Sequence, residues 1–129
     1  MEVTGQGAAA LLYVLIVAGV IGFQFCLIAG APWGRLTQGG RHAGALPPAG
    51  RIAAGLSVLL LAGMAAAIAS AAGLFPGWPG WTAWGALAVQ LASTILNWIT
   101  PSRAERMLWG PVTTLMLALA AFVTLAATP

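Results

Sequence analysis

Apolar residues run almost without interruption through stretches of the chain at about residues 7–30, 52–74, 81–100 and 107–128. None of these four stretches contains Asp, Glu, Lys or Arg. At a rise of about 1.5 Å per residue, a helix of this length crosses the ~30 Å hydrocarbon layer of a bilayer. The pattern therefore predicts an all-α fold, a four-transmembrane-helix bundle that forms one membrane domain over residues 1–129.

The strength of this pattern differs between the four stretches. The first is too long for the core of a secretory signal, and Glu2 rather than Lys or Arg precedes it, so we expect a retained helix. The third is the least apolar, because polar residues such as Gln90 and Asn97 interrupt it. In the fourth, Pro111 suits a first helical turn and predicts a kink between a short interfacial segment and the span.

Composition agrees with a membrane protein. Hydrophobic residues make up 60% of the chain and charged residues only 5%, whereas a soluble domain carries about 25% charged residues. Intrinsic disorder is excluded as well, because it requires low hydrophobicity and high charge. Cys26 is the single cysteine, so an intrachain disulfide cannot form.

The five basic residues are all arginines and lie in two loops, 31–51 and 101–106. Because positively charged loops stay in the cytoplasm, both loops are predicted to be cytoplasmic, with both chain termini outside. High Ala and Gly content and the use of Arg in place of Lys favour a bacterial source, so we expect the bacterial cytoplasmic (inner) membrane. The arginines sit beside apolar segments instead of forming the dense basic face that nucleic-acid binding requires.

Polar side chains within the spans need partners, because hydrocarbon contains no water. Gln90, Thr94 and Asn97 recur at i, i+4 and i+7, which places them on one helix face. Gln24 and Ser57, like Asn97, fall near the cytoplasmic ends of their spans, so this intramembrane polar stripe gathers there. We favour interhelical hydrogen bonds, worth about 0.6 kcal/mol each, as its role. The alternative is a polar vestibule open to the cytoplasm.

The first cytoplasmic loop is long and rich in Gly and Pro, whereas connections between helices usually take about 2–8 residues. Such a loop is either functional or loosely ordered. Arginine side chains are suitable hydrogen-bond donors for an anion. The ligand-binding or anion-binding candidates of the two loops and their helix ends are Arg35, Arg41, His42, Arg51, Asn97, Arg103, Glu105 and Arg106.

Two structural roles are open for Glu105. Ser102-x-x-Glu105 matches a capping box, in which Ser102 starts a helix and Glu105 reaches back to the Ser102 amide. Glu105 is also positioned to form an ion pair with an arginine of the first loop, which would lock the two loops together. The two roles are compatible.

The residues of both loops form a recognisable pattern. It consists of Gly30-x-Pro32-Trp33-Gly34, Gly39-Gly40, Leu46-Pro47 and Arg51, followed by Asn97, Ser102, Glu105-Arg106, Trp109 and Pro111. This pattern resembles that of an uncharacterised family of small four-span bacterial integral membrane proteins. The resemblance covers the two loops and the adjoining helix ends, and it implies a fold but no particular activity.

Three functions fit the sequence to different degrees. The first is a non-enzymatic membrane protein whose arginine-rich face binds anionic lipid headgroups or another anion, or docks a partner. The second is a small oligomeric transporter or channel for a neutral or anionic solute, since cation transport normally uses a membrane-embedded carboxylate, which the spans lack. The third and least favoured is an interfacial lipid-modifying enzyme that uses His42 or Glu105.

Chemistry-bearing residues are few. The chain has no Asp, and its single histidine and single cysteine do not form a catalytic set or a metal-ligand cluster with the two glutamates. We therefore expect no catalytic residues, no metal and no cofactor. Membrane lipids are the expected partners, together with further copies of the chain in a homo-oligomer or other subunits in a larger membrane complex.

Overall fold

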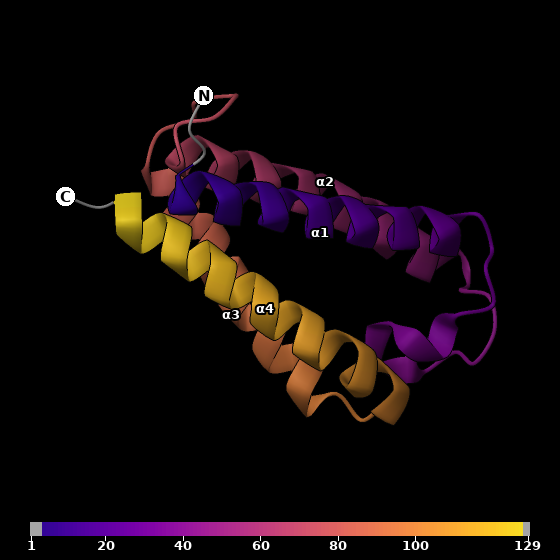
Figure 1. Cartoon of the computed structure of the whole chain (residues 1–129). Coiled ribbons are helices and arrows are strands. Elements are labelled where there is room, and N and C mark those ends of the chain that lie inside the picture. Colours follow the sequence, from indigo (N-terminus) through magenta and orange to yellow (C-terminus); the bar gives the residue numbers. More distant parts are fainter. Residues whose placement is uncertain (1–3, 128–129) are drawn as a thin grey trace.

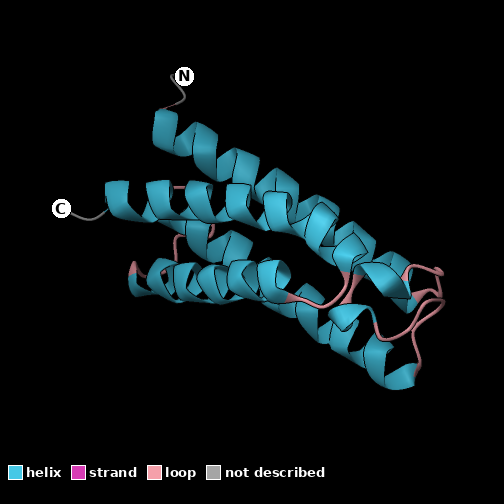
Figure 2. Ribbon diagram, turned by 90° about the horizontal axis from the view of Figure 1, so that it is seen from below, coloured by secondary structure: helices cyan, strands magenta, loops and turns pink. Residues whose placement is uncertain are grey.

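The computed structural model describes residues 4–127, and these form helices without any strand (Figure 2). The four long helices are α1 (Gly5–Ile28), α2 (Pro48–Ala71), α3 (Trp81–Ile99) and α4 (Arg103–Ala127). Two short 3₁₀ turns, η1 (Gly34–Leu36) and η2 (Gln38–Gly40), lie in the connection between α1 and α2. The prediction of an all-α protein with four helices is confirmed.

Three of these helices, α1, α2 and α4, are long and apolar enough to cross a membrane. The chain is therefore a membrane protein by the length and composition of its helices. The 19-residue helix α3 is not among the three. Its amide side chains Gln90 and Asn97 lower its mean hydropathy, as the sequence led us to expect.

The helices pair into two antiparallel hairpins, α1 with α2 and α3 with α4 (Figure 1). The hairpins lie close together at the end where α1 begins, α4 ends and the 72–80 connection runs. They diverge toward the opposite end, where the segment with η1 and η2 lies between them. The two arginine-bearing loops therefore share one end of the molecule, as predicted.

Alanines make up much of the interior, together with larger buried side chains such as Tyr13, Leu27 and Ile68. Other large apolar side chains such as Leu15 and Leu59 are at least half exposed, around the outside of the bundle. This distribution suits a lipid environment, where helices associate by close approach of small residues rather than by burying large ones. The buried alanines are Ala10, Ala54, Ala67, Ala69, Ala83, Ala86 and Ala120.

Two helices begin earlier than the apolar pattern predicted. Helix α2 begins at Pro48, a first-turn position that tolerates the missing N–H. Helix α4 begins at Arg103 rather than near 107, because the Ser102 hydroxyl accepts a hydrogen bond from the Glu105 amide. Pro111 consequently lies inside one continuous helix instead of in its first turn.

Candidate functional site: a cavity between the two hairpins

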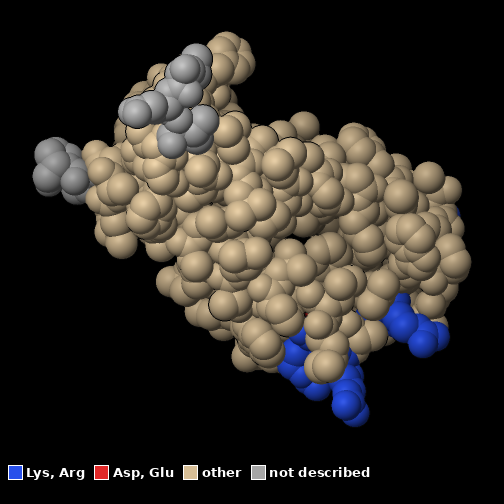
Figure 3. All heavy atoms as spheres, in the orientation of Figure 1, with Lys and Arg blue, Asp and Glu red and all other residues tan. Residues whose placement is uncertain are grey.

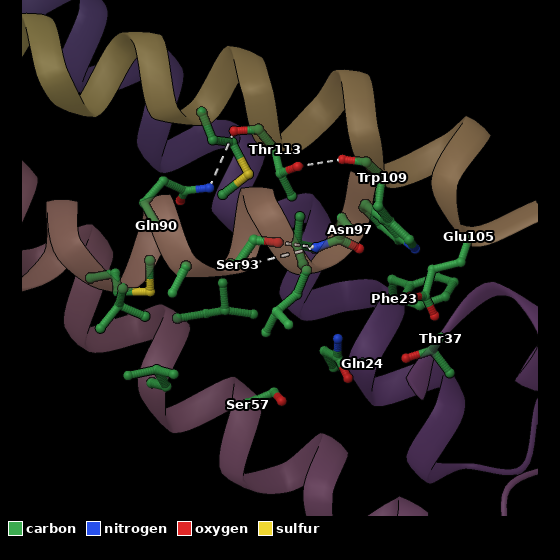
Figure 4. Close-up of a pocket in the computed structure, with 18 of the residues that line it drawn as sticks. Phe23, Gln24, Thr37, Ser57, Gln90, Ser93, Asn97, Glu105, Trp109 and Thr113 are labelled. Carbon is green, nitrogen blue, oxygen red and sulfur yellow. Dashed lines mark hydrogen bonds between the residues drawn. The ribbon is translucent and has the colours of Figure 1, made fainter. Parts of the chain in front are cut away.

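A cavity of about 460 Å³ opens where the two hairpins diverge, and all four helices and the first loop contribute to its wall. Figure 4 shows Gln24 from α1, Ser57 from α2 and Asn97 from α3 around the same space, with Glu105 and Trp109 from α4. Its lining residues are Val20, Phe23, Gln24, Leu36, Thr37, Gln38, Ser57, Leu60, Leu61, Met64, Val89, Gln90, Ala92, Ser93, Leu96, Asn97, Glu105, Trp109, Thr113 and Met116.

The predicted polar stripe is brought together at this cavity, but its members have different roles. Gln90 is 1% exposed, and its carbonyl oxygen accepts a 2.9 Å hydrogen bond from the Tyr13 hydroxyl of α1. Its amide nitrogen donates to the Thr113 carbonyl of α4 at 3.3 Å, and the Thr94 hydroxyl donates to the same carbonyl at 3.0 Å. Gln90 and Thr94 thus join α1, α3 and α4, in agreement with the interhelical hydrogen bonds that we favoured.

Other members of the stripe face the cavity with hydrogen-bonding capacity to spare. Among the described residues, the Asn97 amide donates only to the carbonyl and hydroxyl of Ser93, and the Ser57 hydroxyl only to the Ala53 carbonyl, all within their own helices. The Gln24 side chain makes no hydrogen bond to the described residues. These side chains give the arginine end of the cavity a polar wall.

The first loop closes this end of the cavity, because it is docked onto the start of α4. The Trp109 indole donates to the Leu36 carbonyl at 2.8 Å, and the Ser102 hydroxyl donates to the Arg35 carbonyl at 2.7 Å. The loop is also tied to α2 by the Gln38 amide, which donates to the Gly50 carbonyl at 2.8 Å. Of the two alternatives for this loop, loose order is therefore wrong.

Glycine is required where the loop meets α4. Gly40 has φ +70°, and a Cβ added there would lie 2.6 Å from the Ser102 Cβ. The absence of a side chain at Gly40 therefore allows the loop backbone to lie close to Ser102.

Glu105 connects the two loops, but not in the predicted way. One carboxylate oxygen accepts a 3.0 Å hydrogen bond from the backbone N–H of Gly39. The predicted ion pair with an arginine is absent within residues 4–127, and that prediction is wrong. Half of the predicted capping box is present, the Glu105 amide bond to Ser102, whereas the Ser102 amide donates to the Thr100 hydroxyl instead of to Glu105.

The arginines lie outside the cavity. Arg51 donates to the Leu46 carbonyl at 2.9 Å and Arg106 to the Thr100 carbonyl at 2.9 Å, so both brace loop backbone. Arg35, Arg41 and Arg103 are exposed and form no ion pair with the described residues. On the face drawn in Figure 3, the arginines gather at the end of the molecule that holds the loops.

The eight candidate residues therefore do not form one site. His42 is exposed on the loop, and only Asn97 and Glu105 of the eight line the cavity. Tyr13, Phe23 and Trp109 also belong to the network or the cavity, although none of them was predicted to. Tyr13 could have been predicted as a network residue from the sequence, because it is the single tyrosine of an apolar span and a buried hydroxyl usually finds a hydrogen-bond partner.

No group of three or more His, Cys, Asp or Glu side chains suited to a metal ion occurs in the part of the chain that the structure describes. No protein-family model matches this sequence, and no curated protein or solved structure matches it. The resemblance of the loops to small bacterial membrane proteins therefore stays a prediction.

Proposed function

We propose that the chain is a four-span protein of the bacterial cytoplasmic membrane, with α3 as its fourth span. Leu91, Ile95 and Ile99 recur at four-residue spacing along α3 and are exposed. The opposite face of α3 holds Gln90 and Thr94, which are hydrogen-bonded inside the bundle. The polar content that lowers the mean hydropathy of α3 is therefore turned away from lipid, and its outer face suits hydrocarbon.

In the proposed orientation the two arginine-bearing loops face the cytoplasm and both chain termini face outward. The arginines all lie in the loops at one end of the bundle, and the 72–80 connection at the other end has none. The positive-inside rule places arginine-bearing loops in the cytoplasm. With four spans, both chain termini then lie on the outer side.

We propose further that the arginine end binds anionic lipid headgroups and that the protein is not an enzyme. The observation that carries this proposal is that Arg35, Arg41 and Arg103 project from one end of the molecule without a carboxylate partner among the described residues. Each basic side chain near a membrane surface attracts anionic lipid by about 1 kcal/mol. This attraction requires only that the arginines are exposed near the membrane surface. It does not require an enclosed binding site.

The test is lipid selectivity in nanodiscs of phosphatidylglycerol and phosphatidylcholine. We expect native mass spectrometry of the purified protein to show phosphatidylglycerol retained preferentially, and R35Q/R41Q/R103Q to lower that preference several-fold. R35K/R41K/R103K is the matched control and keeps most of the preference, because it keeps the charge. Equal retention of the two lipids by the wild-type protein would contradict the proposal.

A role as a small oligomeric transporter or channel receives less support. Beyond Gln90, the space between the helices is filled by a packed core that includes the fully buried Tyr13, Ala120 and Val123. In one chain the cavity ends at this core, so passage of a solute would need a path between chains.

A further inference from the structure

The carboxylate of Glu105 is unusual for its position. It is 7% exposed and lines the cavity, yet its one hydrogen bond within the described residues comes from the Gly39 amide. No arginine pairs with it. Because a carboxylate removed from water is stabilised by a cation or by several hydrogen bonds, this wall of the cavity has capacity for a positive partner.

Aromatic rings stand beside this carboxylate. Phe23 and Trp109 both line the cavity and meet edge to face with ring centroids 4.9 Å apart, and one face of Phe23 is stacked on Trp33 at 5.8 Å. Figure 4 shows them with Glu105 and Thr37 at one end of the cavity. An aromatic face attracts an organic cation, and more strongly when water is excluded. The unpartnered amide of Gln24 adds a carbonyl oxygen that suits the same charge.

The rest of the wall combines apolar side chains with the polar Ser57, Ser93 and Asn97. Leu60, Leu61, Met64, Val89 and Met116 line the cavity away from the loop. The volume of about 460 Å³ is that of a small-molecule site, for which about 300–1,000 Å³ is typical. Charge, aromatic surface and apolar surface are thus arranged along one cavity.

We propose that this cavity binds a small amphiphilic organic cation, with its ammonium group against Glu105, Phe23 and Trp109 and its apolar part among the leucine and methionine side chains. An anionic headgroup does not suit the cavity, since Glu105 has the wrong charge and no arginine lines the wall. The site is separate from the exposed arginines and does not depend on their binding lipid.

The test uses the full chain in dodecyl maltoside micelles, because this detergent carries no charge and no ammonium group that would compete for the site. The probe is benzyltrimethylammonium, and benzenesulfonate is the probe of opposite charge. We expect calorimetry to show saturable binding of the cation, one per chain, and no saturable binding of the anion. Glu105→Gln is expected to weaken cation binding at least tenfold, because its side-chain oxygen keeps the Gly39 hydrogen bond but loses the charge.

A second pair of variants covers the case in which Glu105→Gln disturbs the loop. Ala92 is exposed and lines the cavity, whereas Ala88, one turn earlier on α3, is exposed and does not. Ala92→Phe is expected to weaken cation binding at least tenfold by filling part of the cavity, and Ala88→Phe to leave it unchanged. The proposal is overturned if the wild-type protein does not bind the cation, if both phenylalanine variants bind it equally well, or if a folded Glu105→Gln protein binds it as the wild type does.

Discussion

Gly34→Ala is expected to open the first loop and to expose it to trypsin. A Cβ at position 34 would lie against the carbonyl oxygens of His42 and Gly44, where the Gly34 amide donates to Gly44 at 3.0 Å. Backbone atoms cannot move aside as a flexible side chain can, so the loop must open. Overpacking of this kind costs about 3 kcal/mol, which corresponds to roughly a hundredfold more of the opened loop available for cleavage.

The measurement is the rate at which trypsin cuts after Arg35 and Arg41 in the nanodisc-embedded protein. Gly44→Ala is the matched control, because a Cβ at position 44 meets no atom within 4 Å and the Gly34 hydrogen bond is kept. It is expected to be cut as slowly as the wild-type protein. If Gly34→Ala is cut no faster than Gly44→Ala, the docked arrangement of the loop is wrong.

Gln90→Leu is expected to destabilise the bundle, whereas the same change at Gln24 is not. Leucine at position 90 leaves the fully buried Tyr13 hydroxyl without its acceptor and removes the link to the Thr113 carbonyl. An unsatisfied buried polar group costs about 2 kcal/mol. Gln24 makes no hydrogen bond to the described residues, so we expect its replacement by leucine to change stability by less than about 0.5 kcal/mol.

Reversible unfolding in mixed detergent micelles compares the two variants directly, since both replace glutamine by leucine in a helix. An additional variant, Tyr13→Phe, removes the hydroxyl together with its need for an acceptor. In a Tyr13→Phe background we expect Gln90→Leu to cost less than it does alone. Equal destabilisation by Gln90→Leu and Gln24→Leu would mean that the network does not hold the helices together.

The apolar pattern was sufficient to predict the four helices because each stretch is long and free of charge. It placed the start of α4 too late, since the Ser102 cap, and not the first apolar residue, sets where that helix begins. The helical spacing of Gln90, Thr94 and Asn97 also predicted one polar face. The spacing of residues along one helix does not indicate which residue of another helix they contact. Tyr13 of α1 was therefore not predicted as the hydrogen-bond partner of Gln90.

The site was less predictable than the fold, because its decisive contacts involve backbone atoms. The Glu105 carboxylate accepts a hydrogen bond from the Gly39 amide, and the Trp109 indole donates one to the Leu36 carbonyl. A pattern of side chains in the sequence does not predict such backbone partners. Charge alone suggested that Glu105 would pair with an arginine of the first loop. The loop instead folds so that Arg35 and Arg41 are exposed, and the carboxylate lines the cavity.

Cysteine accessibility tests the proposed four-span topology most directly. In a Cys26→Ser background, single cysteines are placed at the exposed residues His42, Trp78 and Pro101 and treated with a membrane-impermeant maleimide in intact bacterial cells. We expect Trp78→Cys to be labelled in intact cells, and His42→Cys and Pro101→Cys only after permeabilisation. Labelling of Trp78→Cys and Pro101→Cys from the same side would show that α3 does not cross the membrane, and labelling of His42→Cys in intact cells would contradict the proposed orientation.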